Sequence, residues 1–288
     1  MASTQVIREL KPLASFCAEA RRAGRTIGLV PTMGALHEGH ASLVRASRDS
    51  CDHTVVTIFV NPAQFAPHED LDRYPRTFAE DLARLEKLGT DVVFAPMPSD
   101  IYPPGFSTYV EPPAVSRLWE GTFRPQFFRG VTTIVLKLFH LIPADISFFG
   151  QKDYQQLRVV QQMVADLNLP IEVRRCPIIR ESDGLAMSSR NRYLDAVQRA
   201  QAVSLSQGLQ EAVILYDQGE RSADQVTLPI YKALQNAGMD RIDYVAVADA
   251  MTLEPVVTIQ GPAVILIAAY VGHTRLIDNC LLGDVTGI

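Results

Sequence analysis

The stretch "TIGLVPTMGALHEGHASLV", residues 26–44, places an apolar run, a turn and the start of a helical pattern in direct succession. The run "TIGLV" is typical of a buried strand, and "PTMGALHEG" is typical of a turn. The segment "HASLVRASRDS" then begins a helix. A strand that turns into a helix opens a β-α-β unit, so we expect the first strand of a parallel sheet here.

Apolar runs and helical patterns keep alternating through the first 180 residues. In the clearest helix, 77–89, Thr77 and Glu80 are expected to form a capping box, and Gly89 is expected to end the helix. Two more helices are predicted, at 131–142 and from Asp153 onward. The candidate strands are 26–30, 53–60, 91–96, 145–150 and 171–179. This order predicts an α/β domain with a parallel sheet.

The pattern changes after residue 195. Two helical segments, 195–219 and 222–238, precede apolar segments at 242–250 and 263–279. Two helices and a few mainly antiparallel strands predict a small α+β domain. Since 288 residues are many for a single core, we expect two domains with a boundary near 180–188.

Composition narrows the class of protein. The formal net charge of −5 disfavours nucleic acid and anionic membranes as partners of the surface as a whole. The sequence has no 18-residue apolar run and no signal-peptide core, which predicts a cytoplasmic protein. The four cysteines are scattered without a C-x-x-C pair, so we expect reduced thiols rather than disulfides or a zinc site.

His37 and His40 lie where the strand at 26–30 gives way to a helix. A helix N-terminus offers unpaired N–H groups and partial positive charge, which favour phosphate. Gly39 would let a nucleoside approach the backbone, and the imidazoles would donate to phosphates. The alternatives are helix capping and a zinc site; zinc is disfavoured because no cysteine or carboxylate is spaced to complete a tetrahedral set.

Three further clusters follow predicted strands. Asn61 and Gln64 could hold a hydroxyl or carboxylate, or simply cap a turn. In "FFGQKDYQQ" (148–156), Gly150 would permit a close turn, Lys152 would bind phosphate, and Asp153 would cap a helix or accept from a ribose hydroxyl. Gln156 would share the face of Lys152 by i,i+4 spacing.

The last cluster is "RESDGLAMSSRNRYL", 180–194, near the expected boundary. Ser188, Ser189 and Arg190 offer two hydroxyls and a guanidinium that can wrap a polyphosphate. A flexible glycine-containing loop here could close over the substrate. A hydrophilic linker is the alternative.

These clusters together resemble the pantoate–β-alanine ligase family of coenzyme A biosynthesis. The segments "PTMGALHEGH", "FVNPAQF", "EGTFRPQFFRGVTTIVLKLF", "FFGQKDYQQL" and "RESDGLAMSSRNRYL" occur in the family's order and spacing. "HEGH" is similar to the HIGH motif of nucleotidylyltransferases and class I aminoacyl-tRNA synthetases, and "MSSRN" to their KMSKS loop. The resemblance implies a Rossmann-like parallel sheet with helices on both faces for ATP and pantoate (1–182), a C-terminal α+β lid domain (183–288), a homodimer, and ATP with Mg²⁺.

The resemblance also implies residue roles. His40 would be the proton donor, assisted by His37, Lys152 and Arg190. ATP would be bound at Met33, Gly34, His37, Gly39, His40, Gly150, Gln151, Lys152, Asp153, Ile179, Met187, Ser188, Ser189 and Arg190. Pantoate and β-alanine would be bound at Met33, Asn61, Gln64 and Gln156. No residue is assigned as a direct metal ligand.

The chain departs from the family's usual pattern at two positions. It has Gln151 where "GEKD" is common, and Phe127 where "RPGHF" has histidine. Neither residue carries a catalytic role in the resemblance, so any contact of the usual side chains is not carried over.

The resemblance implies a two-step reaction. Pantoate carboxylate would attack the α-phosphorus of ATP to give pantoyl adenylate and pyrophosphate; the amine of β-alanine would then displace AMP to give pantothenate. The main alternative is an adenylyltransferase of the same superfamily that acts on another small acid or stops at a nucleotide-linked product. A nucleotide-binding regulator without turnover would leave His37, Lys152 and Arg190 unexplained.

Overall fold

The computed structural model describes residues 4–67, 69–239 and 241–284, which belong to two compact units. The sheet unit lies within the bounds Met1–Gln151 and Gln156–Pro177. The C-terminal unit lies within Lys152–Gln155 and Ile178–Ile288. The short segment Lys152–Gln155 therefore belongs to the C-terminal unit, although the residues on both sides of it belong to the sheet unit.

The sheet unit is built on six parallel strands in the order β1-β4-β3-β2-β5-β6, which confirms the expected parallel sheet. The strands are β1 (Gln5–Ile7), β2 (Ile27–Thr32), β3 (His53–Ile58), β4 (Val92–Phe94), β5 (Ile146–Gly150) and β6 (Glu172–Cys176). The run at 26–30 was expected to be the first strand, and this is wrong. It forms β2, near the middle of the sheet, because the three-residue β1 precedes it and is too short for a periodic pattern.

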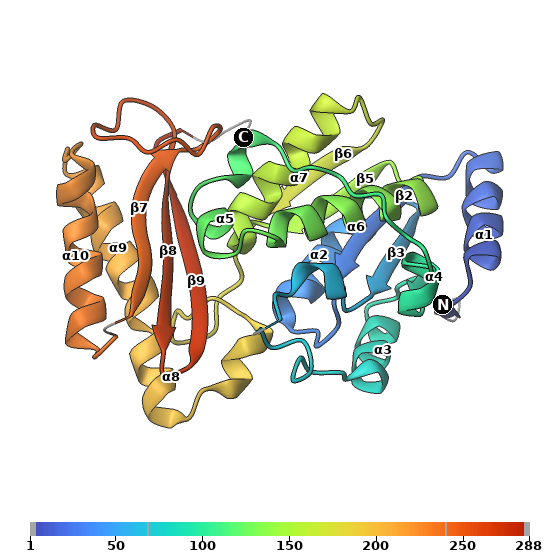
Figure 1. The fold of residues 1–288 in the computed structure, drawn as a ribbon, viewed down its shortest axis with the longest axis horizontal. Coiled ribbons are helices and arrows are strands. Elements are labelled where there is room, and N and C mark those ends of the chain that lie inside the picture. The colour runs from blue at the N-terminus through green and yellow to red at the C-terminus, as the bar shows by residue number, and fades with distance from the viewer. Residues whose placement is uncertain (1–3, 68, 240, 285–288) are drawn as a thin grey trace. The chain divides into compact units, whose positions relative to one another are not determined.

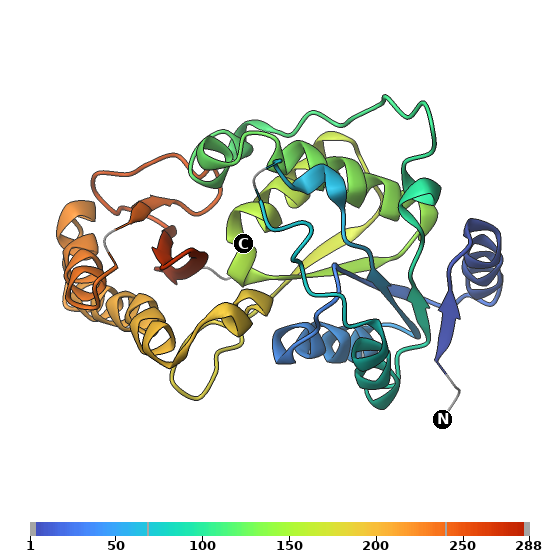
Figure 2. The same cartoon turned by 60° about the horizontal axis from the view of Figure 1, so that its bottom comes forward.

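Helices cover both faces of this sheet, with α2 and α3 on one face and α6 and α7 on the other (Figures 1 and 2). The helices are α1 (Leu10–Arg22), α2 (Glu38–Ser50), α3 (Phe78–Lys87), α4 (Pro98–Ile101), α5 (Glu120–Phe123), α6 (Phe127–Leu141) and α7 (Tyr154–Asp166). Nine residues of α6 are buried, as its nearly continuous apolar sequence predicts. Within the described ranges, no helix is long and apolar enough to cross a membrane.

Helix α2 packs directly on β2. A Cβ atom at Gly28 would collide with Ser47 Oγ, so only glycine allows this approach. Val30 of β2 and Val44 of α2 are buried in the same apolar cluster, together with Leu85 of α3. This packing fixes the N-terminus of α2 at the carboxyl end of β2.

The strand order reverses between β2 and β5, because β3 and β4 lie on one side of β2 and β5 and β6 on the other. The pairing of β2 with β5 ends at Leu29 and Ser147. Each strand continues for three more residues, to Thr32 and Gly150. Open α/β sheets bind ligands at such a switch point, outside the carboxyl ends of the strands.

The expected capping box of α3 is wrong. The Thr77 hydroxyl does not cap the helix; it donates to Asp81 Oδ2 at 3.1 Å. Gly89 has a φ of 73° and follows the last turn, so the predicted glycine at the helix end is confirmed.

The C-terminal unit packs helices against an antiparallel sheet in the order β7-β8-β9 (Figure 1). Its elements are α8 (Ala196–Ala202), α9 (Ser204–Asp217), α10 (Ala223–Asn236), β7 (Ile242–Asp249), β8 (Ala263–Val271) and β9 (Thr274–Leu282). The single helix expected at 195–219 is divided at Val203. There the Ser204 hydroxyl donates to the Gln201 carbonyl at 2.7 Å and competes with the helical backbone.

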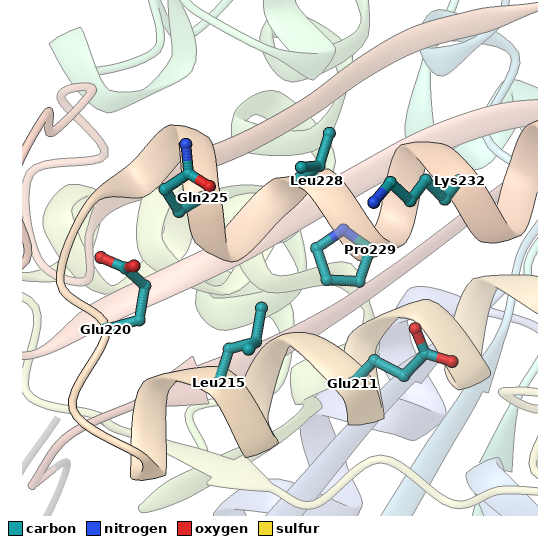
Figure 3. A pocket seen from close by; sticks show the side chains of 7 residues that line it. All are labelled: Glu211, Leu215, Glu220, Gln225, Leu228, Pro229 and Lys232. Carbon is teal, nitrogen blue, oxygen red and sulfur yellow. The ribbon is translucent and has the colours of Figure 1, made fainter.

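Helices α9 and α10 lie close together where a Cβ at Gly208 would be 2.8 Å from Ile230 Cα. Elsewhere along the pair lies a shallow hollow of about 240 Å³ (Figure 3). Leu215, Leu228 and Pro229 line it, and the charged Glu211, Glu220 and Lys232 surround them. None of the sequence-predicted site residues lies there.

Candidate functional site

The turn after β2 has a constrained backbone. Gly34 and Ala35 have φ angles of 84° and 51°, in the left-handed region. The N–H groups of Ala35 and Leu36 both donate to the Asp81 carboxylate, at 2.9 and 2.7 Å. Asp81 lies on α3 and is only 3% exposed. A buried carboxylate from another element therefore fixes this turn.

His37 and His40 cap α2 reciprocally. His37 Nδ1 accepts from Gly39 N–H at 3.2 Å, and His40 Nδ1 accepts from His37 N–H at 3.3 Å. The ring centroids are 4.1 Å apart. Because each Nδ1 accepts a hydrogen bond, each neutral ring carries its proton on Nε2. The capping alternative and the phosphate-binding prediction are thus compatible: one ring nitrogen builds the helix start and the other is a donor.

The second cluster forms a short 3₁₀ turn, η1 (Pro62–Gln64), capped by Asn61. Asn61 Oδ1 accepts from the Tyr102 hydroxyl at 2.7 Å, and its amide group donates to Gln64 Oε1 at 2.8 Å and to the Gly130 carbonyl at 3.2 Å. Burial raises the pKa of Tyr102, which keeps the phenol a neutral donor. Asn61 thus acts as the turn-capping amide that its position allowed, and it orients Gln64.

Gly130 lets α6 pack against this turn. A Cβ atom there would collide with the Ala63 carbonyl. We expect Gly130→Ala to destabilise the fold by about 1–3 kcal/mol, because the backbone of η1 must move. Thermal unfolding measures the effect. Gly150→Ala is the matched control for stability, since a Cβ there would meet no protein atom within 4 Å. Equal melting temperatures of the two variants would contradict this account of Gly130.

The third cluster differs from expectation in two ways. Gly150 is not among the residues with positive φ, and a Cβ there meets no protein atom within 4 Å, so no close turn requires glycine. Lys152 lies in the 3₁₀ turn η3 (Gln151–Asp153) ahead of α7, so its expected i,i+4 relation to Gln156 is wrong. The open space at Gly150 instead suits the close approach of a ligand.

Lys152 is anchored through its backbone. Asn279 of β9, which is 2% exposed, donates from Nδ2 to the Lys152 carbonyl at 2.9 Å. Two residues later, the buried Tyr154 hydroxyl donates to the Ala250 carbonyl at 2.7 Å. These bonds explain why Lys152–Gln155 belongs to the C-terminal unit and leave the Lys152 ammonium group for other contacts.

The fourth cluster starts at a partly buried ion pair. Arg180 donates from both terminal nitrogens to Asp278, at 2.7 and 3.0 Å, and Asp278 is 2% exposed. Burial opposes the charge of Arg180, but the hydrogen bonds and charge of Asp278 outweigh it and raise the Arg180 pKa. Asp278 and Asn279 are neighbours in the middle of β9, so one strand holds both Arg180 and Lys152.

The following loop is held together by its own polar groups. The Met187 N–H donates to the Ile179 carbonyl at 3.0 Å, which places these two predicted ATP positions side by side. Asn191 donates to Glu181 at 2.9 Å and to the Ala186 carbonyl at 3.1 Å. Ser188 Oγ accepts from the Arg190 N–H at 3.3 Å and starts the 3₁₀ turn η4 (Ser189–Tyr193).

Glu181 should give this loop an acid-sensitive contribution to stability. Its hydrogen bonds from Arg199 outweigh burial and lower its pKa below 4.5. The stabilisation is therefore complete above pH 4.5 and is lost as the pH falls through the lower folded-state pKa. We expect Glu181→Gln to melt below the wild type at pH 7, with the difference vanishing in acid. A difference in melting temperature that is the same at all pH values would contradict this assignment.

The two positions that depart from the family pattern lie in the sheet unit. The Phe127 ring lies 3.9 Å from the Arg124 guanidinium, which also pairs with Glu69 at 2.6 Å and Glu120 at 3.1 Å. Gln151 opens the 3₁₀ turn after β5 and is half-buried. Phe127 thus belongs to a cation–π and ion-pair cluster.

Each unit groups a part of the predicted site. In the sheet unit, residues 33–40 and 61–64 follow β2 and β3, and residues 150–151 lie at the end of β5, all at the carboxyl edge of the sheet. In the C-terminal unit, Lys152 and the loop at 178–191 are both attached to β9. Sequence reasoning missed Asp81, Arg180, Asp278 and Asn279. Only Asp81 had a local signal, since it falls on the apolar face of its helix between Phe78 and Leu85.

Comparison with known proteins identifies the family of this chain. The family model described as pantoate-beta-alanine ligase matches residues 5–281. The pantothenate synthetase of Thermotoga petrophila is 50% identical over 279 residues, which are 97% of this chain and 100% of the relative. That of Magnetococcus marinus is 51% identical over 280 residues, 96% of each protein.

Two solved structures are also similar. The crystal structure of pantothenate synthetase from Thermus thermophilus has a TM-score of 0.91 at 39% identity and covers 96% of this chain and 98% of its own. The pantoate-beta-alanine ligase of Francisella tularensis, solved with beta-gamma ATP and beta-alanine, has a TM-score of 0.81 at 31% identity and covers 97% and 98%. With its fold, motifs and nearly full-length matches in agreement, the chain belongs to the pantoate–β-alanine ligase family.

Proposed function

We propose that this protein joins pantoate to β-alanine at the expense of ATP, through a pantoyl-adenylate intermediate, with release of AMP and pyrophosphate. The observation that carries the proposal is the family match over residues 5–281. The position of the motifs supports it, because they follow parallel strands around a switch point, where α/β sheets bind nucleotides.

In the sheet unit, the start of α2 would receive the phosphates of ATP. The N-terminus of the helix favours anions, and the Nε2–H groups of His37 and His40 add two donors. The open space beside Gly150 would admit the nucleoside. We assign Met33, Gln64 and Gln156 to pantoate, with Asn61 orienting Gln64.

In the C-terminal unit, we assign Lys152, Ser188, Ser189 and Arg190 to the leaving pyrophosphate. Fixed cations and hydroxyls at the site where negative charge develops stabilise the transition state without reorganisation. Their backbone is fixed in advance, because Asn279 holds Lys152 and Ser188 caps η4. The remaining predicted ATP positions are Gly34, Gly39, Gln151, Asp153, Ile179 and Met187.

We propose that Mg²⁺ enters as part of the substrate, bound to the phosphates of ATP. Among residues 4–67, 69–239 and 241–284, no three His, Cys, Asp or Glu side chains are grouped as a protein metal site requires. Mg²⁺ commonly keeps waters and binds substrate phosphates rather than an all-protein cage. The chain's own contribution would then be the cationic and hydroxyl groups named above.

Pyrophosphate exchange into ATP tests the proposal. Exchange should require pantoate, and AMP should be released only after β-alanine is added. Exchange that responds to another acid, or a stable adenylate as end product, would favour the alternative adenylyltransferase. The homodimer, the cytoplasmic location and the domain limits 1–182 and 183–288 stay predictions of the sequence.

A further inference from the structure

We infer that Asp81 is a positioning residue for His37 and His40, and so for adenylate formation. The inference rests on the proposed function, because it concerns the turn at residues 34–36 that precedes the two histidines of the proposed site. Asp81 lies on α3, 41 or more residues further along the chain than either histidine. It binds the backbone immediately before His37, through the N–H groups of Ala35 and Leu36.

Asp81 binds the turn that joins β2 to α2. Gly34 and Ala35 have successive left-handed φ angles of 84° and 51°. Such a backbone turns consecutive N–H groups toward one point and forms a small anion-binding concavity. Here the N–H groups of Ala35 and Leu36 point at the two oxygens of the Asp81 carboxylate, at 2.9 and 2.7 Å. The protein's own carboxylate fills the concavity, so these two N–H groups are not the ones that bind phosphate.

The carboxylate is fixed on its own side as well. Asp81 is 3% exposed, and Oδ2 also accepts from the Thr77 hydroxyl at 3.1 Å. A Cβ atom at Gly34 would lie 3.2 Å from Oδ2, so there is little space for displacement. Asp81 therefore holds the chain immediately before His37 in a conformation that a non-glycine residue such as Ala35 disfavours.

The fixed turn determines the direction of both imidazoles. His37 follows Leu36 directly, and its N–H and Nδ1 make the two bonds of the reciprocal cap. A shift of Leu36 would move His37, and through its N–H bond also His40. Since catalysis depends steeply on the alignment of donors with the reacting group, Asp81 should affect the rate more than pantoate binding.

The test is Asp81→Asn, which keeps the shape but places an NH₂ group against one of the two backbone donors. We expect kcat to fall about 10- to 100-fold and KM for pantoate to stay within about threefold. The ¹⁵N resonances of the His37 and His40 rings should shift. Asp100→Asn is the matched control, because Asp100 also accepts from a backbone N–H, that of Met97 at 2.9 Å, in the same unit.

A folded Asp81→Asn variant with kcat within about twofold of wild type, or with unchanged histidine resonances, would overturn the inference. If the variant does not fold, hydrogen exchange of the wild type decides: slow exchange of the Ala35 and Leu36 amides supports the inference, and fast exchange of either overturns it. Wild-type protein that shows no pantoate-dependent exchange of pyrophosphate into ATP would refute the proposed function instead. The histidine resonances distinguish the two failures, because they report on the rings whether or not the protein turns over substrate.

Discussion

His40→Ala is expected to lower kcat by about 100- to 1000-fold, which is the usual loss when one donor to a developing charge is removed. His40 uses Nδ1 to accept from the His37 N–H at 3.3 Å, so the donor that the substitution removes from the reaction is Nε2–H. The same substitution removes a helix cap, so stability should fall by about 0.5–2 kcal/mol. Steady-state AMP release and thermal unfolding measure the two effects.

His40→Gln separates the cap from the chemistry. Glutamine at the third helical position can accept from the N–H of the capping residue, as in an ordinary capping box. The variant should recover most of the melting temperature and none of the rate. Turnover near the wild-type level in either variant would refute the role given to His40.

Substitutions that keep the helix cap can also distinguish the roles of His37 and His40. His37→Asn keeps a good N-cap residue while it removes the imidazole. If His40 donates the proton and His37 only stabilises charge, substituting His40 should erase one limb of the pH–rate profile, whereas His37→Asn should lower the whole profile. Loss of a limb in the His37 variant alone would reverse the assignment.

Lys152→Ala should lower kcat by a similar factor, about 100-fold or more, because a fixed positive charge would no longer meet the leaving pyrophosphate. The melting temperature should hardly change, since the structure holds Lys152 by its carbonyl, which alanine retains. Pyrophosphate exchange measures the rate of the step directly.

Asn279→Ala is the informative comparison for Lys152. It keeps the ammonium group and removes the 2.9 Å bond that fixes its backbone. The rate loss should be smaller than for Lys152→Ala, and the melting temperature should fall because the partly buried Lys152 carbonyl loses its donor. Near-normal pyrophosphate exchange by Lys152→Ala would exclude the lysine from the reaction.

The sequence predicted the parallel sheet and the antiparallel second sheet because burial imposes periodicity on strands and helices. It failed where length or distance removed the local signal. Strand β1 has only three residues. The bond between Asn279 and Lys152 spans 127 positions, so no local pattern indicates it.

For the candidate site, too, the prediction reached only as far as the local sequence signal. Residues that stand after predicted strands, such as His37, Gln64 and Lys152, could be proposed from their position alone. Residues that hold them were missed. The place of Asp81 on the apolar face of its helix was a signal that went unused, and no local pattern links Asp278 to Arg180, 98 positions away. Asn61 combined both cases: the sequence allowed a ligand or a cap, and its buried amide is used by Tyr102, Gln64 and Gly130.

The chain passes from one unit to the other at 151/152, 155/156 and 177/178. These crossings matter for protein engineering. A fragment that stops at residue 177 would contain Tyr154 without Ala250, its hydrogen-bond partner. A fragment that starts at residue 178 would lack the Tyr154 side chain, which is only 1% exposed in the whole protein. Chimaeras that swap the C-terminal half between homologues should therefore transplant the tetrapeptide Lys152–Gln155 with it. A chimaera with a single junction near residue 178 would combine Lys152 of one parent with Asn279 of the other.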